Sequence, residues 1–385
     1  MIVKLNDVVD RIKGNVDRFN TDLIYYVGGE HYESSRIAIY TPGLLDSEKG
    51  ATLGFKFHFP FQKGDVLFMA RNPHLRKAGM VMFDGICSDA SYILRTKDSS
   101  VLLQEYLALI VQCDRFWDFF EANKSGSVNY LMNWKELQNY EFDLPSMEEQ
   151  RKIADLAWAI ERTRVAYEGL IRATDELVKS QFIDCFGIPG SDVFGWGLTT
   201  LGECCELNPR RPKNMNSDIE YSFVAMPSVG NDGIVDSSIT RPYSEVCKGF
   251  TYFAENDVLF AKITPCMENG KGGIAVDLVN GAGFGSTEFH VLRPIEGVSD
   301  PYWLYIITMF PKFRIDAEKV MTGSGGQRRV PISYLNEYVI SLPPIDLQKQ
   351  FAAFVHQTDK SKFELTQALE ALNATYKKLI SENLG

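Results

Sequence analysis

Leu144-Pro145-Ser146-Met147-Glu148-Glu149-Gln150 is the stretch on which the organisation of this chain depends. A second copy, Leu342-Pro343-Pro344-Ile345-Asp346-Leu347-Gln348, lies 198 residues further on. The prolines end a preceding strand, because proline lacks a backbone donor and restricts the residue before it. A long stretch without proline follows each copy, to about Phe182 after the first and to Gly385 after the second. The repeat therefore predicts two long helices that begin at equivalent points of a duplicated chain.

Apolar residues recur three and four positions apart in both predicted helices, which is typical of a coiled-coil seam. About 34 residues at 1.5 Å per residue span about 50 Å, which is too long for one small domain to cover. Each helix could still be a surface helix packed only on its own domain, but the duplication favours two helices that pack on each other. The predicted pairing residues are Ile153, Leu156, Ile160, Tyr167, Leu170 and Leu177 in the first helix and Phe351, Phe354, Leu365, Leu372 and Leu379 in the second.

The sequence before each helix predicts a mixed α+β domain. Short apolar runs with strand character precede a predicted helix over Leu102–Ala122, and the segment Tyr140–Leu144 is a predicted strand. The same layout recurs in the second half at lower identity, with a helix predicted over Tyr302–Ala317. The matched strands are Asp65-Val-Leu-Phe with Asp257-Val-Leu-Phe and Tyr92-Ile-Leu-Arg with His290-Val-Leu-Arg.

We therefore predict an α+β chain of two similar globular domains, residues 1–143 and 188–341, separated by two long helices, residues 144–187 and 342–385. The two helices are expected to form an antiparallel coiled coil with a pseudo-twofold internal duplication. Antiparallel packing would hold the domains at opposite ends of a rod. The short connection that follows the first helix disfavours the parallel arrangement, which would place both domains at one end.

Composition narrows the class of protein. The chain has 385 residues and 45% hydrophobic residues, enough for full-sized cores. The first residues lack the apolar run of a signal peptide, and no stretch reaches the ~18 apolar residues that a membrane span needs. We expect a cytoplasmic protein without a membrane partner. The seven cysteines contain no Cys-x-x-Cys pair and the five histidines have no metal-ligand spacing, so we expect buried cysteines and no metal site.

The formal charge of −10 gives no sign of nucleic-acid binding. Each of the four predicted segments has at least as many acidic as basic residues. Attraction to DNA would therefore have to come from local basic clusters and from other members of an assembly.

Catalytic signatures are missing from the sequence. A nuclease centre commonly uses Glu-x-Lys or Asp-x-Lys, and neither tripeptide occurs. A base methyltransferase would need Asn/Asp-Pro-Pro-aromatic, and Asn72-Pro73 and Asn208-Pro209 match only its first two letters. The glycine-rich segment Gly281–Gly285 precedes a predicted strand, where a nucleotide-binding loop would precede a helix. We therefore expect no catalytic residues and no directly bound cofactor.

Polar and basic loops remain as candidate DNA-contacting segments. Arginine and glutamine suit guanine and adenine edges, whereas lysine, serine and glycine-rich turns suit phosphates. Any single loop could be an ordinary solvated turn, but two of them, Ser125–Asn129 and Thr322–Arg329, occupy equivalent places in the repeats. The candidate DNA-binding residues are Arg71, His74, Arg76, Lys77, Lys124, Ser125, Ser127 and Asn129 in the first domain, and Arg210, Arg211, Lys213, Lys262, Thr264, Asn269, Lys271, Gln327, Arg328 and Arg329 in the second.

The arrangement resembles the specificity (S) subunit of type I restriction–modification systems. The resemblance covers essentially the whole chain and rests on the paired Leu-Pro-x-x-x-x-Gln starts, the helix after each, the Asp-Val-Leu-Phe strands, and Thr322-Gly-Ser with the downstream Arg-Arg-Val. The first domain departs from this pattern, because it lacks an equivalent of Gln327-Arg328-Arg329 and of Ser286-Thr287-Glu288.

The resemblance implies two target-recognition domains, each reading one half of a bipartite site in double-stranded DNA through the major groove. The helices would set the gap between the half-sites and dock two DNA-methyltransferase (modification) subunits. Those subunits would carry S-adenosylmethionine, and a restriction/translocase subunit would supply ATP- and Mg-dependent cleavage. The alternative is a coiled-coil scaffold whose domains bind protein, which the acidic balance favours. An enzyme with an unfamiliar active site is a second alternative, which the missing signatures disfavour.

Overall fold

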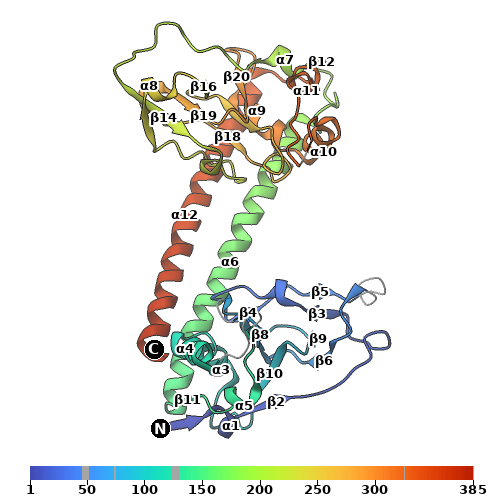
Figure 1. Ribbon diagram of the computed structural model, residues 1–385. Helices are drawn as coiled ribbons and strands as arrows, with labels where there is room; N and C mark the ends of the chain where they lie inside the picture. Colours follow the sequence, from blue (N-terminus) through green and yellow to red (C-terminus); the bar gives the residue numbers. More distant parts are fainter. Residues whose placement is uncertain (46–51, 73–74, 124–129, 325, 385) are drawn as a thin grey trace. The chain divides into compact units, whose positions relative to one another are not determined.

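The computed structural model describes residues 1–45, 52–72, 75–123, 130–324 and 326–384. The chain divides into two compact units (Figure 1). Unit 1 comprises Met1–Leu170 with Leu365–Gly385, and unit 2 comprises Ile171–Glu364. The two long helices, α6 (Met147–Phe186) and α12 (Ile345–Leu384), each contribute one part to each unit. Each begins within the repeated proline-to-glutamine segment, as predicted, and is 40 residues long, against a predicted length of about 34.

The described strands of unit 1 form three sheets. Strand β1 (Ile2–Lys4) pairs with β11 (Glu141–Asp143) just before α6 begins. A five-stranded sheet has the order β2 (Val9–Ile12), β10 (Ser91–Thr96), β7 (Val66–Met69), β8 (Ala78–Val81) and β4 (Ala38–Ile39). A four-stranded sheet has the order β5 (Gly43–Leu44), β3 (Tyr25–Val27), β9 (Gly85–Ser88) and β6 (Phe57–Phe61), with β3 and β9 parallel.

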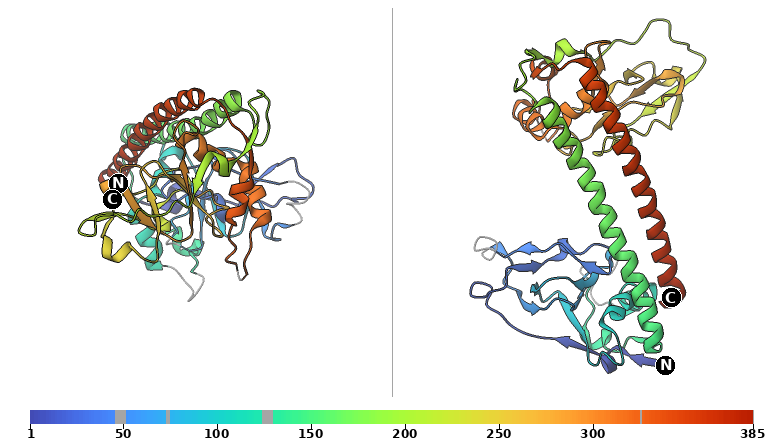
Figure 2. Two further views of the ribbon diagram at one scale, coloured as in Figure 1. Left: turned by 90° about the horizontal axis from the view of Figure 1, so that it is seen from above. Right: turned by 180° about the vertical axis from the view of Figure 1, so that it is seen from behind.

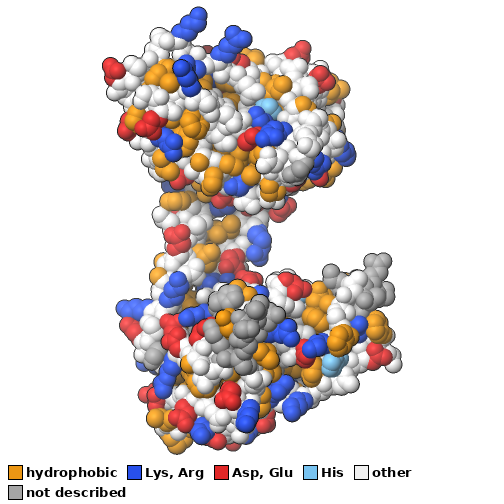
Figure 3. Space-filling view, viewed as in Figure 1, with side chains coloured by type: hydrophobic (Ala, Val, Ile, Leu, Met, Phe, Trp, Pro, Cys, Tyr) orange, Lys and Arg blue, Asp and Glu red, His pale blue; other side chains and the backbone are white. Residues whose placement is uncertain are grey.

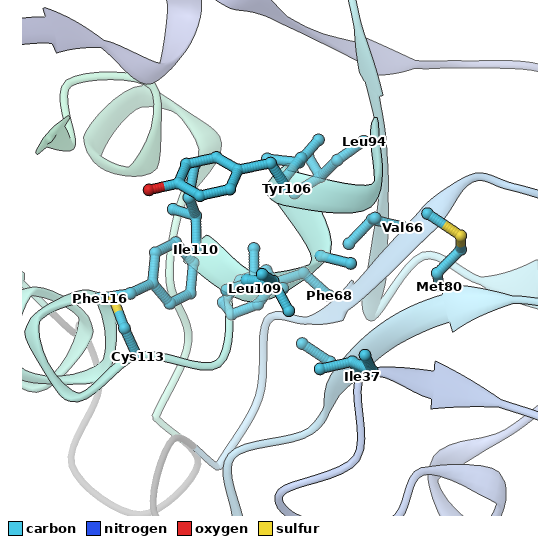
Figure 4. Close-up of a cluster of buried hydrophobic side chains, with 14 of the residues drawn as sticks. Ile37, Val66, Phe68, Met80, Leu94, Tyr106, Leu109, Ile110, Cys113 and Phe116 are labelled. Atoms are coloured by element: carbon cyan, nitrogen blue, oxygen red, sulfur yellow. The ribbon is translucent and has the colours of Figure 1, made fainter. Parts of the chain in front are cut away.

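The helix predicted over Leu102–Ala122 is two helices, α3 (Gln104–Ile110) and α4 (Asp114–Asn123). All residues of Tyr106–Val111 are buried, whereas α4 buries only one face through Phe116, Trp117 and Phe120. The break at residues 111–113 redirects the chain, so that both segments cover the same core. Figure 4 shows this core, where Phe116 of α4 and Tyr106 of α3 lie with side chains of the five-stranded sheet such as Val66 and Phe68. The shorter helices of unit 1 are α1 (Leu5–Val8), η1 (Gly29–His31) and α5 (Trp134–Leu137).

Unit 2 repeats the strand order of unit 1. Strand β12 (Leu198–Thr200) pairs with β21 (Val339–Ser341) before α12 begins. One four-stranded sheet has the order β13 (Cys205–Leu207), β20 (Phe289–Pro294), β17 (Val258–Ala261) and β18 (Gly272–Ile274). The other has the order β15 (Thr240–Pro242), β14 (Glu220–Val224), β19 (Ala282–Gly285) and β16 (Thr251–Ala254), with β14 and β19 parallel. The chain is therefore an α+β duplication, and among its described strands only β4 has no counterpart in unit 2.

The helices of unit 2 also follow those of unit 1. They are α7 (Leu201–Cys204), η3 (Met226–Ser228), α8 (Tyr243–Val246), η4 (Val279–Gly281), α9 (Pro301–Met309), α10 (Pro311–Val320) and α11 (Ile332–Glu337). The helix predicted over Tyr302–Ala317 is interrupted at Phe310-Pro311, because proline cannot donate within a helix. The glycine-rich segment Gly281–Gly285 is mostly strand β19, where a Cβ on Gly283 would collide with the ring of Phe253. Gly283 and Gly285 are therefore explained by close packing, and Gly281 by its positive φ of 68°.

A buried glutamine explains the last letter of the repeated motif. Gln150 and Gln348 are both fully buried. The Gln150 amide donates to the carbonyls of Val101 and Pro145 and accepts from the backbone N–H of Leu103. Gln348 does the same with Val298, Pro343 and Asp300. Each glutamine therefore ties the start of a long helix to the loop before α3 or α9 and satisfies backbone groups that would otherwise be buried unpaired.

The repeated Asp-Val-Leu-Phe strand is explained by a bidentate ion pair. Asp65 accepts from Nε and Nη2 of Arg95 at 2.7 and 2.9 Å. Asp257 accepts from the same two atoms of Arg293 at 2.8 and 2.7 Å. Both carboxylates are almost completely buried, and each also accepts a backbone N–H bond, from Gln62 or Ala254. The two pairs join equivalent neighbouring strands, β7 to β10 and β17 to β20.

The two long helices are antiparallel within each unit (Figures 1 and 2). In unit 1, Ile160 of α6 shares a core with Tyr376 and Ile380 near the end of α12. In unit 2, the ring centroids of Phe182 and Phe186, near the end of α6, lie 5.5 and 5.3 Å from that of Phe351, near the start of α12. Residue numbers therefore rise along one helix as they fall along the other.

The predicted seam of α6 is correct at Ile160, which is buried, but wrong at three of its leucines. Leu156, Leu170 and Leu177, which were predicted to pair, are 50%, 51% and 50% exposed. Five buried positions are each one residue later than a seam position, namely Ala154, Ala157, Glu161, Arg164 and Val178. One residue turns a helix by about 100°, so a different face meets the core.

The physical reason is a buried charge cluster that an apolar pattern does not reveal. Glu161 is 0% exposed, and its carboxylate lies 3.0 Å from Nε of Arg36 and 3.3 Å from Nη1 of Arg164. Arg36 also donates to Glu168 at 2.7 Å. Of the other predicted pairing residues, Ile160 and Phe351 are buried and Ile153, Tyr167, Phe354, Leu365, Leu372 and Leu379 are partly buried.

Candidate nucleic-acid interface

The candidate residues of unit 1 are only partly described. His74 and the segment with Lys124, Ser125, Ser127 and Asn129 lie outside the described residues. Arg71 is exposed, whereas Lys77 donates its ammonium to the carbonyl of Gly29 at 2.6 Å. Arg76 is paired with Asp114 at the start of α4. Within the described part of unit 1, Arg71 is thus the basic candidate that is not occupied by an internal partner.

Three separate candidate segments of unit 2 meet in space. The backbone N–H of Thr264 donates to the carbonyl of Arg328 at 3.0 Å, and that of Val330 donates to Lys262 at 2.9 Å. Residues 262–264, which follow β17, therefore run beside residues 328–330, which precede α11. The turn that connects β17 to β18 carries Asn269, which is exposed, and Lys271, whose ammonium donates to the carbonyl of Met226.

The two arginines of Gln327-Arg328-Arg329 are held by carboxylates. Arg329 donates from Nε and Nη2 to the two oxygens of Glu288 at 2.9 and 2.7 Å. This bond lowers the pKa of Glu288 and raises that of Arg329. Arg328 lies 3.5 Å from Glu318 and 3.6 Å from Glu268. The guanidinium of Arg329 is therefore oriented before any ligand binds. The side chain of Gln327, two residues earlier, is exposed.

Glu288 is a further candidate residue that the sequence prediction missed, because it holds the candidate Arg329. Its segment, Ser286-Thr287-Glu288, was recognised as absent from the first domain, and this difference was the available signal. The segment lies between β19 and β20, and the carbonyl of Glu288 accepts from the backbone N–H of Lys262. Glu288 thus connects the Lys262 segment with the Arg329 segment.

A polar cavity of about 420 Å³ lies beside these segments in unit 2. Its walls include Asn208, Arg211 and Lys262, together with the aromatic residues Phe250 and Tyr252. Arg211 also donates to the carbonyl of Cys247, and its guanidinium lies 5.4 Å from the ring centroid of Tyr243. Its neighbours Arg210 and Lys213 are exposed and do not line the cavity.

Burial changes the proton affinity of two groups in this region. Desolvation lowers the pKa of Lys262, an effect that Glu288 opposes and Arg329 reinforces. Burial also lowers the pKa of His290 to about 4. The His290 ring donates from Nε2 to the carbonyl of Val330 at 2.9 Å and accepts at Nδ1 from the amide of Asn208 at 3.2 Å. The neutral imidazole therefore connects the turn at Asn208 to the Arg329 segment.

The described surface is not a uniform basic patch. Figure 3 shows Lys and Arg side chains interspersed with Asp and Glu over this face. This distribution agrees with the charge count, in which no predicted segment has an excess of basic residues, and leaves local clusters as the means of contacting DNA. Among the described residues, no group of three or more His, Cys, Asp or Glu side chains could hold a metal ion. No helix within the described ranges is long and apolar enough to cross a membrane.

A family model described as the type I restriction modification DNA specificity domain matches residues 1–165 and 195–373. The chain belongs to this family. Each matched stretch contains one complete set of the repeated strands and the beginning of the long helix that follows them. The duplication seen in the fold is thus a duplication of the specificity domain.

Two specificity subunits of Escherichia coli are similar to part of the chain. That of type I restriction enzyme EcoEI is 37% identical over 205 residues, which are 52% of this chain and 33% of that protein. That of EcoAI is 36% identical over 194 residues, which are 50% of this chain and 32% of that protein. The matched region thus spans about a third of the length of each of these relatives.

A solved structure has the same fold at low identity. The type I restriction–modification S subunit from M. genitalium has a TM-score of 0.56 and 13% identity, over 99% of this chain and 94% of that one. At this identity the likeness concerns the fold alone.

Proposed function

We propose that this chain is the DNA sequence-recognition subunit of a type I restriction–modification complex. The observation that carries the proposal is that the specificity-domain model matches two stretches, one over each structural repeat. Two copies of one recognition fold on a single chain suit a target made of two half-sites. When two recognition domains are linked in one chain, binding of the second half-site becomes intramolecular once the first is bound. DNA that contains both half-sites is therefore strongly preferred.

In this proposal residues 1–143 and 188–341 are the two target-recognition domains. In the second domain, Arg329 and Gln327 are the base-reading candidates, because Arg329 has a preset fork and Gln327 is exposed. Lys213, Arg210 and Lys262 contribute phosphate contacts. In the first domain the described candidate is Arg71, with the segment 124–129 as a further one.

Residues 144–187 and 342–385 would set the gap between the half-sites and dock two methyltransferase subunits. Exposed apolar side chains on the helices support such docking. In unit 1, Leu156 and Leu170 are half-exposed and about four helical turns apart, so they lie on nearly the same side of α6. In unit 2, Leu177 and Phe363 are 50% and 61% exposed. Apolar side chains left open to water mark surfaces for a partner.

The chain itself would be non-catalytic. S-adenosylmethionine would be bound by the methyltransferase subunits, and ATP and Mg by a restriction/translocase subunit. The partners would also supply much of the attraction to DNA phosphates that this acidic chain lacks.

The test is to co-express the chain with a methyltransferase encoded beside it, purify the complex and footprint duplex DNA. We expect two protected segments, and methylation at a bipartite sequence in cells that carry both genes. Arg329→Ala should weaken protection of one segment only. A stable complex without a sequence-specific footprint would contradict the proposal, as would methyl transfer by the chain alone.

A further inference from the structure

The cavity of unit 2 has features that DNA phosphate contacts alone do not explain. It combines two cations, Arg211 and Lys262, with the aromatic side chains of Phe250 and Tyr252. None of its lining residues is acidic. Its volume of about 420 Å³ suits a ligand of several rings rather than a bare anion.

Two aromatic side chains form one wall of the cavity. Phe250 immediately precedes β16 and Tyr252 lies within it, and both line the cavity. Phe253, on the other side, is fully buried in a core cluster. Phe250 remains 36% exposed, so a flat ligand can reach its ring.

The cationic wall is partly desolvated. Lys262 is half-buried, and no described side chain forms an ion pair or hydrogen bond with its ammonium. Its half-buried position limits hydration of the ammonium, and this burial lowers the pKa of Lys262. Arg211 is oriented by the carbonyl of Cys247 and by the ring of Tyr243. Two such cations, one of them poorly hydrated, suit a phosphate group.

We propose that this cavity binds one nucleotide unit, with its base stacked on Phe250 and its phosphate held by Arg211 and Lys262. The amide of Asn208 lies on the same wall. Stacking on an aromatic ring is sequence-tolerant, because every base has a π-face, whereas the cations provide the preference for a phosphate. The nucleotide comes either from an unstacked position in DNA or from a free mononucleotide pool. Binding of a nucleotide that belongs to DNA rests on the proposed function, whereas binding of a free mononucleotide does not.

The full-length chain offers a matched pair of variants for the test. Arg211→Gln removes a cation that lines the cavity, and Lys248→Gln removes the same charge from a nearby exposed residue that does not line it. Phe250→Ala removes the exposed ring. Binding of deoxyadenosine monophosphate, deoxyadenosine, inorganic phosphate and a short single-stranded oligodeoxynucleotide is measured by calorimetry, and contacts to base protons by saturation-transfer NMR. Thermal unfolding of each variant shows whether it is folded.

We expect the wild-type chain and Lys248→Gln to bind the mononucleotide equally. Arg211→Gln and Phe250→Ala should each weaken binding about tenfold, as expected for one charged bond or one stacked base. Deoxyadenosine and phosphate alone should bind more weakly than the mononucleotide. Competition by the oligonucleotide indicates the DNA source, and its absence indicates the free mononucleotide.

The proposal is overturned when neither the mononucleotide nor the oligonucleotide binds, or when Lys248→Gln and Arg211→Gln lose affinity equally. These results are distinct from a failure of the proposed function, which is judged by the duplex footprint of the complex with its methyltransferase. A sequence-specific footprint without nucleotide binding would leave the recognition function intact and remove only the cavity's role.

Discussion

Glu288 decides what Arg329 can do in the absence of DNA. Both carboxylate oxygens of Glu288 accept hydrogen bonds from the planar guanidinium of Arg329, so the guanidinium is held in one orientation. The same carboxylate repels DNA phosphates and competes with them for the arginine. We therefore infer that Glu288 restrains sequence-independent binding and lets Arg329 exchange its partner only for a well-placed acceptor on a base.

Glu288→Gln is expected to strengthen non-specific DNA binding and to lower the ratio of specific to non-specific affinity. The variant removes one negative charge, so the slope of log affinity against log salt should steepen by about one. Fluorescence anisotropy at several salt concentrations, with specific and scrambled duplexes, measures both quantities. Glu296→Gln is the matched control. Glu296 is exposed, and the substitution removes the same negative charge away from Arg329. An unchanged specificity ratio would argue against this role.

His290 makes the stability of the second domain depend on pH. Its pKa is about 4 in the folded chain against 6.5 for the ordinary imidazole. Between these values the unfolded chain carries a proton that the native chain lacks, so stability falls as the pH decreases from 6.5 to 4. The slope is about 1.4 kcal/mol per pH unit, and the contribution is constant above pH 6.5.

His290→Gln keeps a donor and an acceptor but does not titrate. Chemical denaturation across pH 4–8 should show that the wild-type chain loses more stability than the variant as the pH is lowered through this window. The difference between the two proteins removes the contribution of carboxylates that titrate in both. A difference that stays constant across the range would show that His290 has no lowered pKa.

At the scale of elements, the charge cluster beneath α6 sets the rotation of that helix. Glu161 is fully buried between Arg36, which precedes β4, and Arg164, one turn further along α6. Its own pKa is raised by burial, which the two arginines oppose. A buried pair adds little net stability compared with apolar packing, but loss of one partner leaves the other charges buried without compensation.

Glu161→Gln should therefore destabilise unit 1 by about 3 kcal/mol or more. Glu176→Gln on the same helix removes an exposed pair with Lys179 and should cost less than about 1 kcal/mol. Urea denaturation at neutral pH, with spectroscopic probes in each unit, compares the two. Equal, small effects of both substitutions would mean that the cluster does not position α6.

At the scale of the whole molecule, the two long helices can be shortened together without changing their faces. Removal of residues 169–175 and 362–368 deletes one heptad from each helix and takes out Asp175 with its ion-pair partner Lys362. Seven residues are nearly two full turns, so the buried faces stay in phase. If the helices set the gap, each becomes about 10 Å shorter, which corresponds to about 3 base pairs of DNA.

The prediction is a recognised site whose two halves are about 3 base pairs closer. Selection from random-gap duplexes, followed by sequencing, measures the gap. Deletion from α6 alone is the control, because it misaligns the antiparallel faces and should abolish assembly. Full activity with the original gap in the paired deletion would rule out the measuring role.

Exchange of the second recognition domain tests the modularity of the duplication. Replacing residues 188–341 with the equivalent domain of another specificity subunit should change one half-site and leave the other unchanged. The structural basis is that β12 and β21 pair beside the start of α12, so both ends of the domain lie together. Methylome sequencing of cells that carry the chimera gives the answer directly. Alteration of both halves would contradict independent reading.

The sequence by itself determined the duplication, the α+β class, the alternation of globular domains with long helices and the starts of both long helices. These features depend on local signals, namely proline before a helix, a glutamine at a constant offset, and the period of apolar residues. It also brought out the separate loops at Lys262 and at Gln327–Arg329 as candidates.

Only the tertiary structure decided which face of α6 is buried and which arginines are already bonded. The buried face carries Glu161 and Arg164, and their charges are compensated by Arg36, which is distant in sequence. A periodic pattern of apolar residues cannot represent such long-range compensation. The same reason hid Glu288, since its role depends on β20 bringing it against Arg329.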